Sequence, residues 1–110
     1  MLLPLTMAAD ETYKSFESHY SRWNQLTSEQ LIEKGNDFMR LPEKYDSAMV
    51  CFSILSNRYY ENRLKGEELA FGVRAMVKMA ALLIHHYGDF EKAQSYLLIA
   101  EDIAEKNNIE

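Results

Sequence analysis

The sequence holds few of the residues that break or cross-link a chain. Its 110 residues include one cysteine, two prolines and four glycines. The lone cysteine, Cys51, cannot form an internal disulfide, so a disulfide framework does not hold the fold. So few prolines and glycines leave little room for the many turns of a β fold. The sequence therefore favours one small domain built from helices.

Runs of lysine or arginine are also missing. The chain carries 12 Lys and Arg against 17 Asp and Glu, which gives a net charge of −5 at pH 7. Because binding to nucleic-acid phosphates needs a basic face, we expect no nucleic-acid partner. Apolar residues make up 47% of the chain, which is enough to bury a core and is not the composition of a disordered chain.

Residues 1–9, MLLPLTMAA, form a short apolar stretch before an acidic segment. A secretory leader carries basic residues ahead of its apolar core, and these are missing here. Two interpretations stay open. A clipped leader predicts an exported, periplasmic protein, whereas a frayed N-terminus that packs on the first helix predicts a cytoplasmic one. The stretch is too short to cross a bilayer, and we expect no membrane span in the chain.

Apolar residues recur at helical spacing over residues 10–110, which we take as a single all-α domain. Thr27 and Gln30 form a capping box, which marks a helix start. Pro42 suits the first turn of another helix, and Gly66 breaks the chain between two hairpins. The expected elements are an end helix at 10–25, a hairpin at 28–61 with helices 28–40 and 42–61, and a hairpin at 67–107 with helices 67–87 and 89–107.

The same spacing predicts which side chains face the core. The fourth helix is apolar nearly all round in its second half, so we expect it to be the most buried. Gly35 lies inside a helix at a cost of about 1 kcal/mol relative to Ala, which predicts that another helix comes close there. The expected inward residues are Tyr13, Phe16, Tyr20 and Trp23, then Leu31, Ile32 and Phe38, then Tyr45, Ala48, Phe52 and Leu55, and finally Phe90, Ala93, Leu97 and Ala100.

The two hairpins repeat one pattern. The inward set of residues 42–61 recurs in residues 89–107, each member 45 residues later, so that Tyr45 corresponds to Phe90 and Phe52 to Leu97. In the preceding helices the spacing is 46, and the one-residue difference falls in the turn. The corresponding pairs there are Leu31 with Val77, Gly35 with Ala81, and Phe38 with Ile84. The structural unit is therefore a helical hairpin that is used twice.

This pattern resembles the tetratricopeptide repeat family over about residues 28–106. The segments that carry the resemblance are LIEKGNDFMRLPEKYDSAMVCFSIL and VKMAALLIHHYGDFEKAQSYLLIAEDIAEK. Gly35, Phe38, Ala48 and Phe52 match the family's alternation of small and aromatic residues. The repeat here is 45 residues long, against about 34 in the family. The resemblance implies a short right-handed α-solenoid of about five stacked helices.

The resemblance also implies a function. Such hairpins bind proteins or peptides without catalysis or a cofactor, and this chain is similar to the N-terminal sensor or scaffold part of certain bacterial regulators. In the family the first helix of each hairpin lines a concave face. The peptide groove implied here is lined by Ile32, Asn36, Met39, Lys78, Leu82 and His85. Exposed ends of a short solenoid also favour a homodimer.

A second hypothesis is a small helical enzyme, or a ligand- or metal-binding protein, that uses the His- and Met-rich helix 67–87. Against a metal site, His85 and His86 are adjacent and point to different sides of a helix, whereas zinc ligands cluster or lie four residues apart. Cys51 has no helical His neighbour and is expected to act as a small buried hydrophobe. Met76 and Met79 are expected in the core. We therefore expect no catalytic, cofactor or metal site.

Overall fold

The computed structural model describes residues 19–109, and every regular element in that range is helical. The all-α prediction is therefore confirmed. Residues 19–23 are helical, and the expected inward residues Tyr13 and Phe16 lie outside the described part of the chain. The helices that follow are α2 (Ser28–Phe38), α3 (Tyr45–Tyr60), α4 (Leu69–Leu82) and α5 (Phe90–Asn107). Short 3-10 turns, Pro42–Lys44 and Gly66–Glu68, lead into α3 and α4, and a π-helical turn, Leu83–Tyr87, extends α4.

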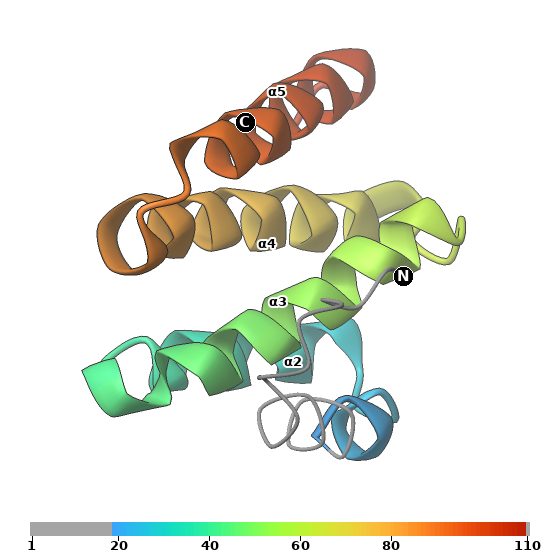
Figure 1. Ribbon diagram of the computed structural model, residues 1–110. Coiled ribbons are helices and arrows are strands. Elements are labelled where there is room, and N and C mark those ends of the chain that lie inside the picture. Colours follow the sequence, from blue (N-terminus) through green and yellow to red (C-terminus); the bar gives the residue numbers. More distant parts are fainter. Residues whose placement is uncertain (1–18, 110) are drawn as a thin grey trace.

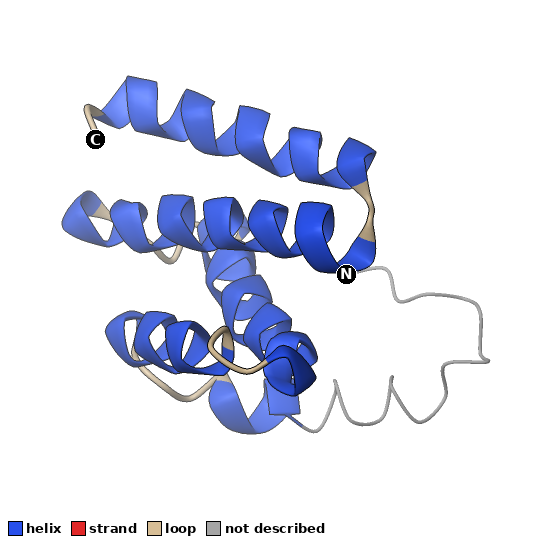
Figure 2. Ribbon diagram, turned by 90° about the vertical axis from the view of Figure 1, so that its left-hand side faces the viewer, coloured by secondary structure: helices blue, strands red, loops and turns tan. Residues whose placement is uncertain are grey.

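Each helix packs against the helix before it and the helix after it. α3 lies between α2 and α4, and α4 lies between α3 and α5 (Figure 1). α2 also touches α4. A view turned by 90° shows α4 and α5 side by side, with α3 crossing beneath them (Figure 2). This order agrees with two stacked hairpins, whereas the handedness of a solenoid stays a prediction.

The helix ends lie where local chemistry places them. The capping box is present: Gln30 N–H donates to Thr27 Oγ1 over 3.1 Å, and Thr27 N–H donates to Gln30 Oε1 over 2.9 Å. At the start of α5, Asp89 Oδ1 accepts a hydrogen bond from Lys92 N–H over 3.1 Å. Just before it, Gly88 has a φ of 70°, a left-handed conformation that glycine adopts without strain. These signals confirm the positions of both turns within one or two residues.

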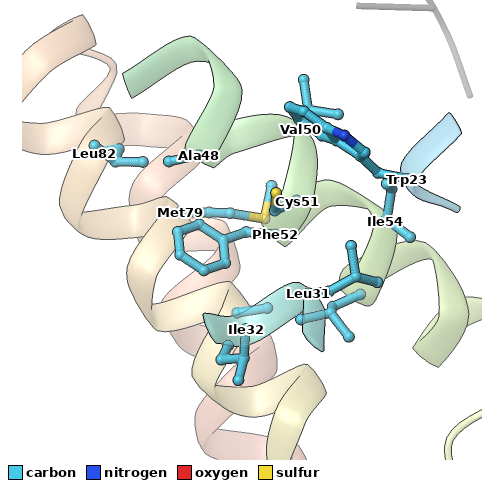
Figure 3. Packing of buried hydrophobic residues seen from close by; sticks show 12 residues of the cluster. Trp23, Leu31, Ile32, Ala48, Val50, Cys51, Phe52, Ile54, Met79 and Leu82 are labelled. Carbon is cyan, nitrogen blue, oxygen red and sulfur yellow. The ribbon is translucent and has the colours of Figure 1, made fainter. Parts of the chain in front are cut away.

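The core is centred on α3 and not on α4. Of the six largest fully buried side chains, four come from α3: Cys51, Phe52, Ile54 and Leu55. The expectation that the fourth helix is the most buried is therefore wrong. The reason is coverage: both helices lie between two others, but α3 also receives the end of the first helix, whereas α4 keeps one side exposed at Val77. In Figure 3 Phe52 lies beside Met79 of α4, while Trp23 lies beside Val50 on the other side.

Gly35 has the close neighbour that the sequence predicts. A Cβ atom built on Gly35 would lie 2.5 Å from Cε1 and 2.7 Å from Cζ of the Phe52 ring. The ring is fully buried, so it has no free space into which to move. Phe52 therefore occupies the volume that a side chain at residue 35 would need, and this glycine sets how closely α2 and α3 approach.

Arg58 ties the first helix to the end of α3, a contact that local spacing does not reveal. Its guanidinium donates to Ser28 Oγ over 3.0 Å and to the carbonyl oxygens of Asn24 and Leu26 over 2.9 and 2.6 Å. Burial lowers the pKa of this guanidinium below its ordinary value, with a further contribution from nearby Arg63. The arginine thus provides hydrogen-bond donors for carbonyl groups in the turn that follows the first helix.

Trp23 closes one end of the core. Its ring lies 5.4 Å from the ring of Phe38, and the imidazole of His19 stacks on it with centroids 4.6 Å apart. The ammonium of Lys34 sits 5.1 Å from the same ring, within the range of a cation–π contact. The first helix is therefore held to α2 by this aromatic cluster as well as by Arg58.

The inward set predicted for α5 is only half right. Ala93 and Ala100 are buried, as expected, but Phe90 and Leu97 are 67% and 41% exposed. The repeat pairs them with Tyr45 and Phe52, which α4 covers in the first hairpin. In the described structure α5 packs chiefly on α4, and Phe90 and Leu97 have no described helix over them.

Gly35→Ala should destabilise the fold despite the higher helix propensity of alanine. Overpacking costs about 1–3 kcal/mol, and the propensity gain offsets about 1 kcal/mol of that. We expect a net loss of about 1 kcal/mol in the free energy of unfolding, measured by urea denaturation. Gly72→Ala is the matched control, because its Cβ would meet the end of the Leu64 side chain at 3.0 Å and Tyr59 Cβ at an ordinary 3.6 Å. Equal stabilities for the two variants would contradict the close approach.

Arg58→Met should destabilise the fold by about 2 kcal/mol, because buried carbonyl groups lose their charged donor. Urea denaturation followed by circular dichroism measures the loss. The control is Arg63→Met, which removes an exposed ion pair of 3.3 Å with Glu61 and should change stability by less than about 0.5 kcal/mol. If the Arg58 variant unfolded at the same urea concentration as the wild type, the hydrogen bonds of Arg58 would contribute nothing to stability.

Candidate interaction surface

The six residues predicted to line a peptide groove differ in accessibility. Ile32 and Leu82 are buried in the core cluster around α3. Asn36, Met39 and Lys78 are half-buried, and His85 is exposed. The amide oxygen of Asn36 is hidden and has no hydrogen-bond partner among the described residues. The set therefore includes two residues that a ligand cannot reach in this structure, and the groove itself stays a prediction.

The histidines near the end of α4 take part in aromatic packing. The ring of His86 meets Tyr45 edge-on at 4.9 Å and Tyr87 at 4.6 Å. The hydroxyl of Tyr87 donates to the carboxylate of Asp46, and burial together with this bond raises the pKa of the Tyr87 phenol. These contacts join the start of α3 to the end of α4. Within residues 19–109 no three His, Cys, Asp or Glu side chains converge on a position that could hold a metal.

Cys51 is enclosed in the core, and Met76 and Met79 are buried as well. Burial raises the pKa of the Cys51 thiol from 9.0 to about 12, although nearby Lys34 lowers it slightly. Because the thiolate is the reactive form, this cysteine is a poor nucleophile at neutral pH. The prediction that it serves as a small buried hydrophobe agrees with its position.

The second hairpin carries an apolar strip on its surface, which we name the α4/α5 face. Three large side chains on it are well exposed: Val77 by 44%, Phe90 by 67% and Leu97 by 41%. Ala81 and Ile84 are half-buried and complete the strip. Exposed apolar residues are ordinary when scattered singly, whereas a contiguous group marks an interaction surface.

Helix geometry shows that these residues share one side of the hairpin. The side chains buried between α4 and α5 include Met76, Ala80, Ala93 and Ala100. Each residue advances about 100° around a helix. Val77 follows Met76 and Leu97 lies one turn after Ala93, so both are rotated away from the α4–α5 contact in the same sense. Antiparallel helices place such residues on the same side of their contact. Val77 therefore neighbours Leu97, and Ile84 neighbours Phe90 near the connecting turn.

The two edges of the α4/α5 face carry opposite charge. Arg74 lies one turn before Val77 on α4, and Glu101 lies one turn after Leu97 on α5; both are exposed. Because the helices run antiparallel, these two residues lie at the same level along the hairpin. The face is therefore an apolar strip with a basic edge on α4 and an acidic edge on α5.

This face is not among the sites predicted from the sequence, although the repeat contains the signal for it. The residues of the face are the equivalents of Leu31, Gly35, Phe38, Tyr45 and Phe52 in the first hairpin. In the first hairpin these positions belong to the core or pack against it. The same types of apolar residue occur at these positions in both hairpins, but a neighbouring helix covers them only in the first. This difference indicates an open apolar surface on the second hairpin.

One helical stretch, Gly66–Tyr87, is long and apolar enough to cross a membrane by length and composition alone. Its mean hydropathy over the best window is 1.3, and 39% of that window is buried in the fold. The core helix of a folded domain passes the same test, and α4 packs between α3 and α5 here. The expectation that the chain contains no membrane span stays a prediction.

No protein-family model, curated protein or solved structure matches this chain. The resemblance to tetratricopeptide repeats therefore rests on the quoted residues alone and stays a prediction.

Cys51 should react with a thiol reagent only when the core opens. In the folded protein at pH 8 we expect modification by a chromogenic disulfide to be at least about a hundredfold slower than in urea, because both access and the thiolate fraction are low. A Cys51→Ala, Ser95→Cys variant, with its thiol on the exposed side of α5, should react at once and serves as the control. Equally fast reaction of native Cys51 would contradict the burial.

Proposed function

We propose that this protein is a non-catalytic interaction module that binds another protein through the α4/α5 face. The observation that carries the proposal is the contiguous exposure of Val77, Phe90 and Leu97 on a packed hairpin. Burying one large apolar side chain contributes about 1.5–3 kcal/mol, so three of them supply a strong drive to bind a complementary surface. A hairpin also presents them in a fixed arrangement, which lowers the entropic cost of binding.

The family resemblance supports the same class of function, because tetratricopeptide hairpins bind proteins and peptides. It also supports a place as the sensor or scaffold part of a larger bacterial regulator. The net charge of −5 favours a protein partner over a nucleic acid. The competing hypothesis is a metal or small-molecule site on helix 67–87. Met76 and Met79 of that helix are buried between helices, so they offer little surface to a ligand.

The test is capture of a partner from an extract of the native host. Phe90→Glu with Leu97→Glu should abolish retention of the partner, because it places two charges in the apolar strip. Leu98→Glu is the matched control: Leu98 is 59% exposed on the same helix and lies about 100° around it from Leu97. All variants should keep the wild-type circular dichroism spectrum.

A third variant separates this face from the predicted groove. Replacing Asn36, Lys78 and His85 by alanine should leave the partner bound if the α4/α5 face is the binding surface. Loss of the partner in this triple variant alone would transfer the function to the groove. Retention by every variant would contradict both surfaces.

A further inference from the structure

We infer that the α4/α5 face binds a second copy of this chain, in a symmetric dimer whose twofold axis runs parallel to α4 and α5. This inference rests on the proposed function and names its partner. In such a dimer the two hairpins form a four-helix arrangement, with α4 of one copy opposite α5 of the other. The contact is closed, because the same face is used on both sides.

The internal repeat favours a second copy as the partner. In the first hairpin the positions equivalent to the α4/α5 face are covered from within the chain: Phe52 lies beside Met79 of α4, and Tyr45 meets His86. A hairpin of this type thus has an apolar side that packs under helices of the same chain. In the second hairpin no described helix covers the equivalent side. A second copy of the chain would cover it with the same type of apolar helix.

The α4/α5 face is also complementary in shape to itself about this axis. Rotation about an axis parallel to the helices exchanges α4 with α5 and keeps each residue at its level. Val77 then faces Leu97 of the second copy, and Ile84 faces its Phe90. Each large side chain then faces a smaller one, leucine against valine and phenylalanine against isoleucine. The space between the hairpins is filled, and no two aromatic rings compete for the same volume.

The charges at the edges of the α4/α5 face are complementary about the same axis. The same rotation places Arg74 of each copy opposite Glu101 of the other, so the basic edge meets the acidic edge twice. The other symmetric arrangement, with its axis across the helices, places α4 on α4 and α5 on α5. That rotation also reverses the level along the hairpin, so Arg74 of one copy does not face Glu101 of the other and the two attractive contacts are lost. Electrostatic complementarity therefore selects the axis parallel to the helices.

The size of the face sets the expected affinity. α5 has 18 residues, so it is about 27 Å long, and two helices side by side cover a strip about 20 Å wide. The face therefore offers roughly 500 Å² per copy, below the roughly 800 Å² of a standard stable interface. We expect a dimer with a dissociation constant in the range of about 1 to 100 µM.

Sedimentation equilibrium of the wild-type chain over about 1 to 500 µM, a range that brackets that affinity, should show a reversible monomer–dimer transition. Leu97→Glu should weaken the dimer at least about a hundredfold, because a carboxylate is buried in the apolar strip. Leu98→Glu, the neighbouring residue on the outer side, should leave the constant within about threefold of wild type. Both variants should keep the circular dichroism spectrum of the wild type.

A charge exchange tests the axis. Arg74→Glu should weaken the dimer by about threefold to tenfold at low salt, and the double variant Arg74→Glu, Glu101→Arg should restore it, because the pairs reform with reversed sign. If the axis ran across the helices, Arg74 would not face Glu101, so the single variant would change the dissociation constant little and the second substitution would restore nothing. An unaffected single variant would therefore overturn this arrangement.

Two further outcomes would overturn the inference. A wild-type monomer at every concentration would exclude the second copy, and a loss of stability in Leu97→Glu would then show that the chain covers the face itself. A dimer that survives Leu97→Glu would form through another surface. Neither outcome decides the proposed function, since capture of a different protein that depends on Phe90 and Leu97 would show that the same face serves another partner.

Discussion

The fold depends on the burial of one central helix. α3 has apolar side chains on nearly every side, from Ala48 through Cys51 and Phe52 to Leu55, and all four are fully buried. A helix of this kind is stable in water only when other helices cover it. α2 and the end of the first helix cover one side and α4 covers the other, so the order of the helices follows from the need to enclose α3. The fit is closest at Gly35, where the absent side chain makes room for the ring of Phe52.

Local features were predictable from the sequence, and features that depend on the neighbours of a helix were not. The capping box at Thr27 and the turn at Gly88 involve residues near one another in the chain, and both were found where the sequence places them. The Arg58 clamp joins residues about 30 positions apart, and no spacing rule detects such a bond. The periodicity of α5 identified its apolar side chains correctly, but it could not tell which of them a neighbour covers. The candidate site was missed for the same reason.

The two hairpins share a sequence pattern and differ in their surroundings, and that difference carries the functional argument. In the first hairpin the repeated apolar positions contribute to the stability of the chain. In the second hairpin the same types of residue remain at the surface, where they weaken solubility unless something binds them. Stability and binding therefore draw on one pattern, and a substitution at position 52 should act on folding whereas its equivalent at position 97 should act on association.

The position of the only tryptophan has a consequence for experiments on this protein. Trp23 packs against Phe38 and His19 at the end of the core farthest along the chain from α5. Its fluorescence therefore reports mainly the environment of the first helix and α2, where its ring contacts lie. Helical circular dichroism reports all the helices together. If the two signals change at the same denaturant concentration, the hairpins unfold as one cooperative unit; if fluorescence changes separately, the first hairpin and the second are independent folding units within a single small domain.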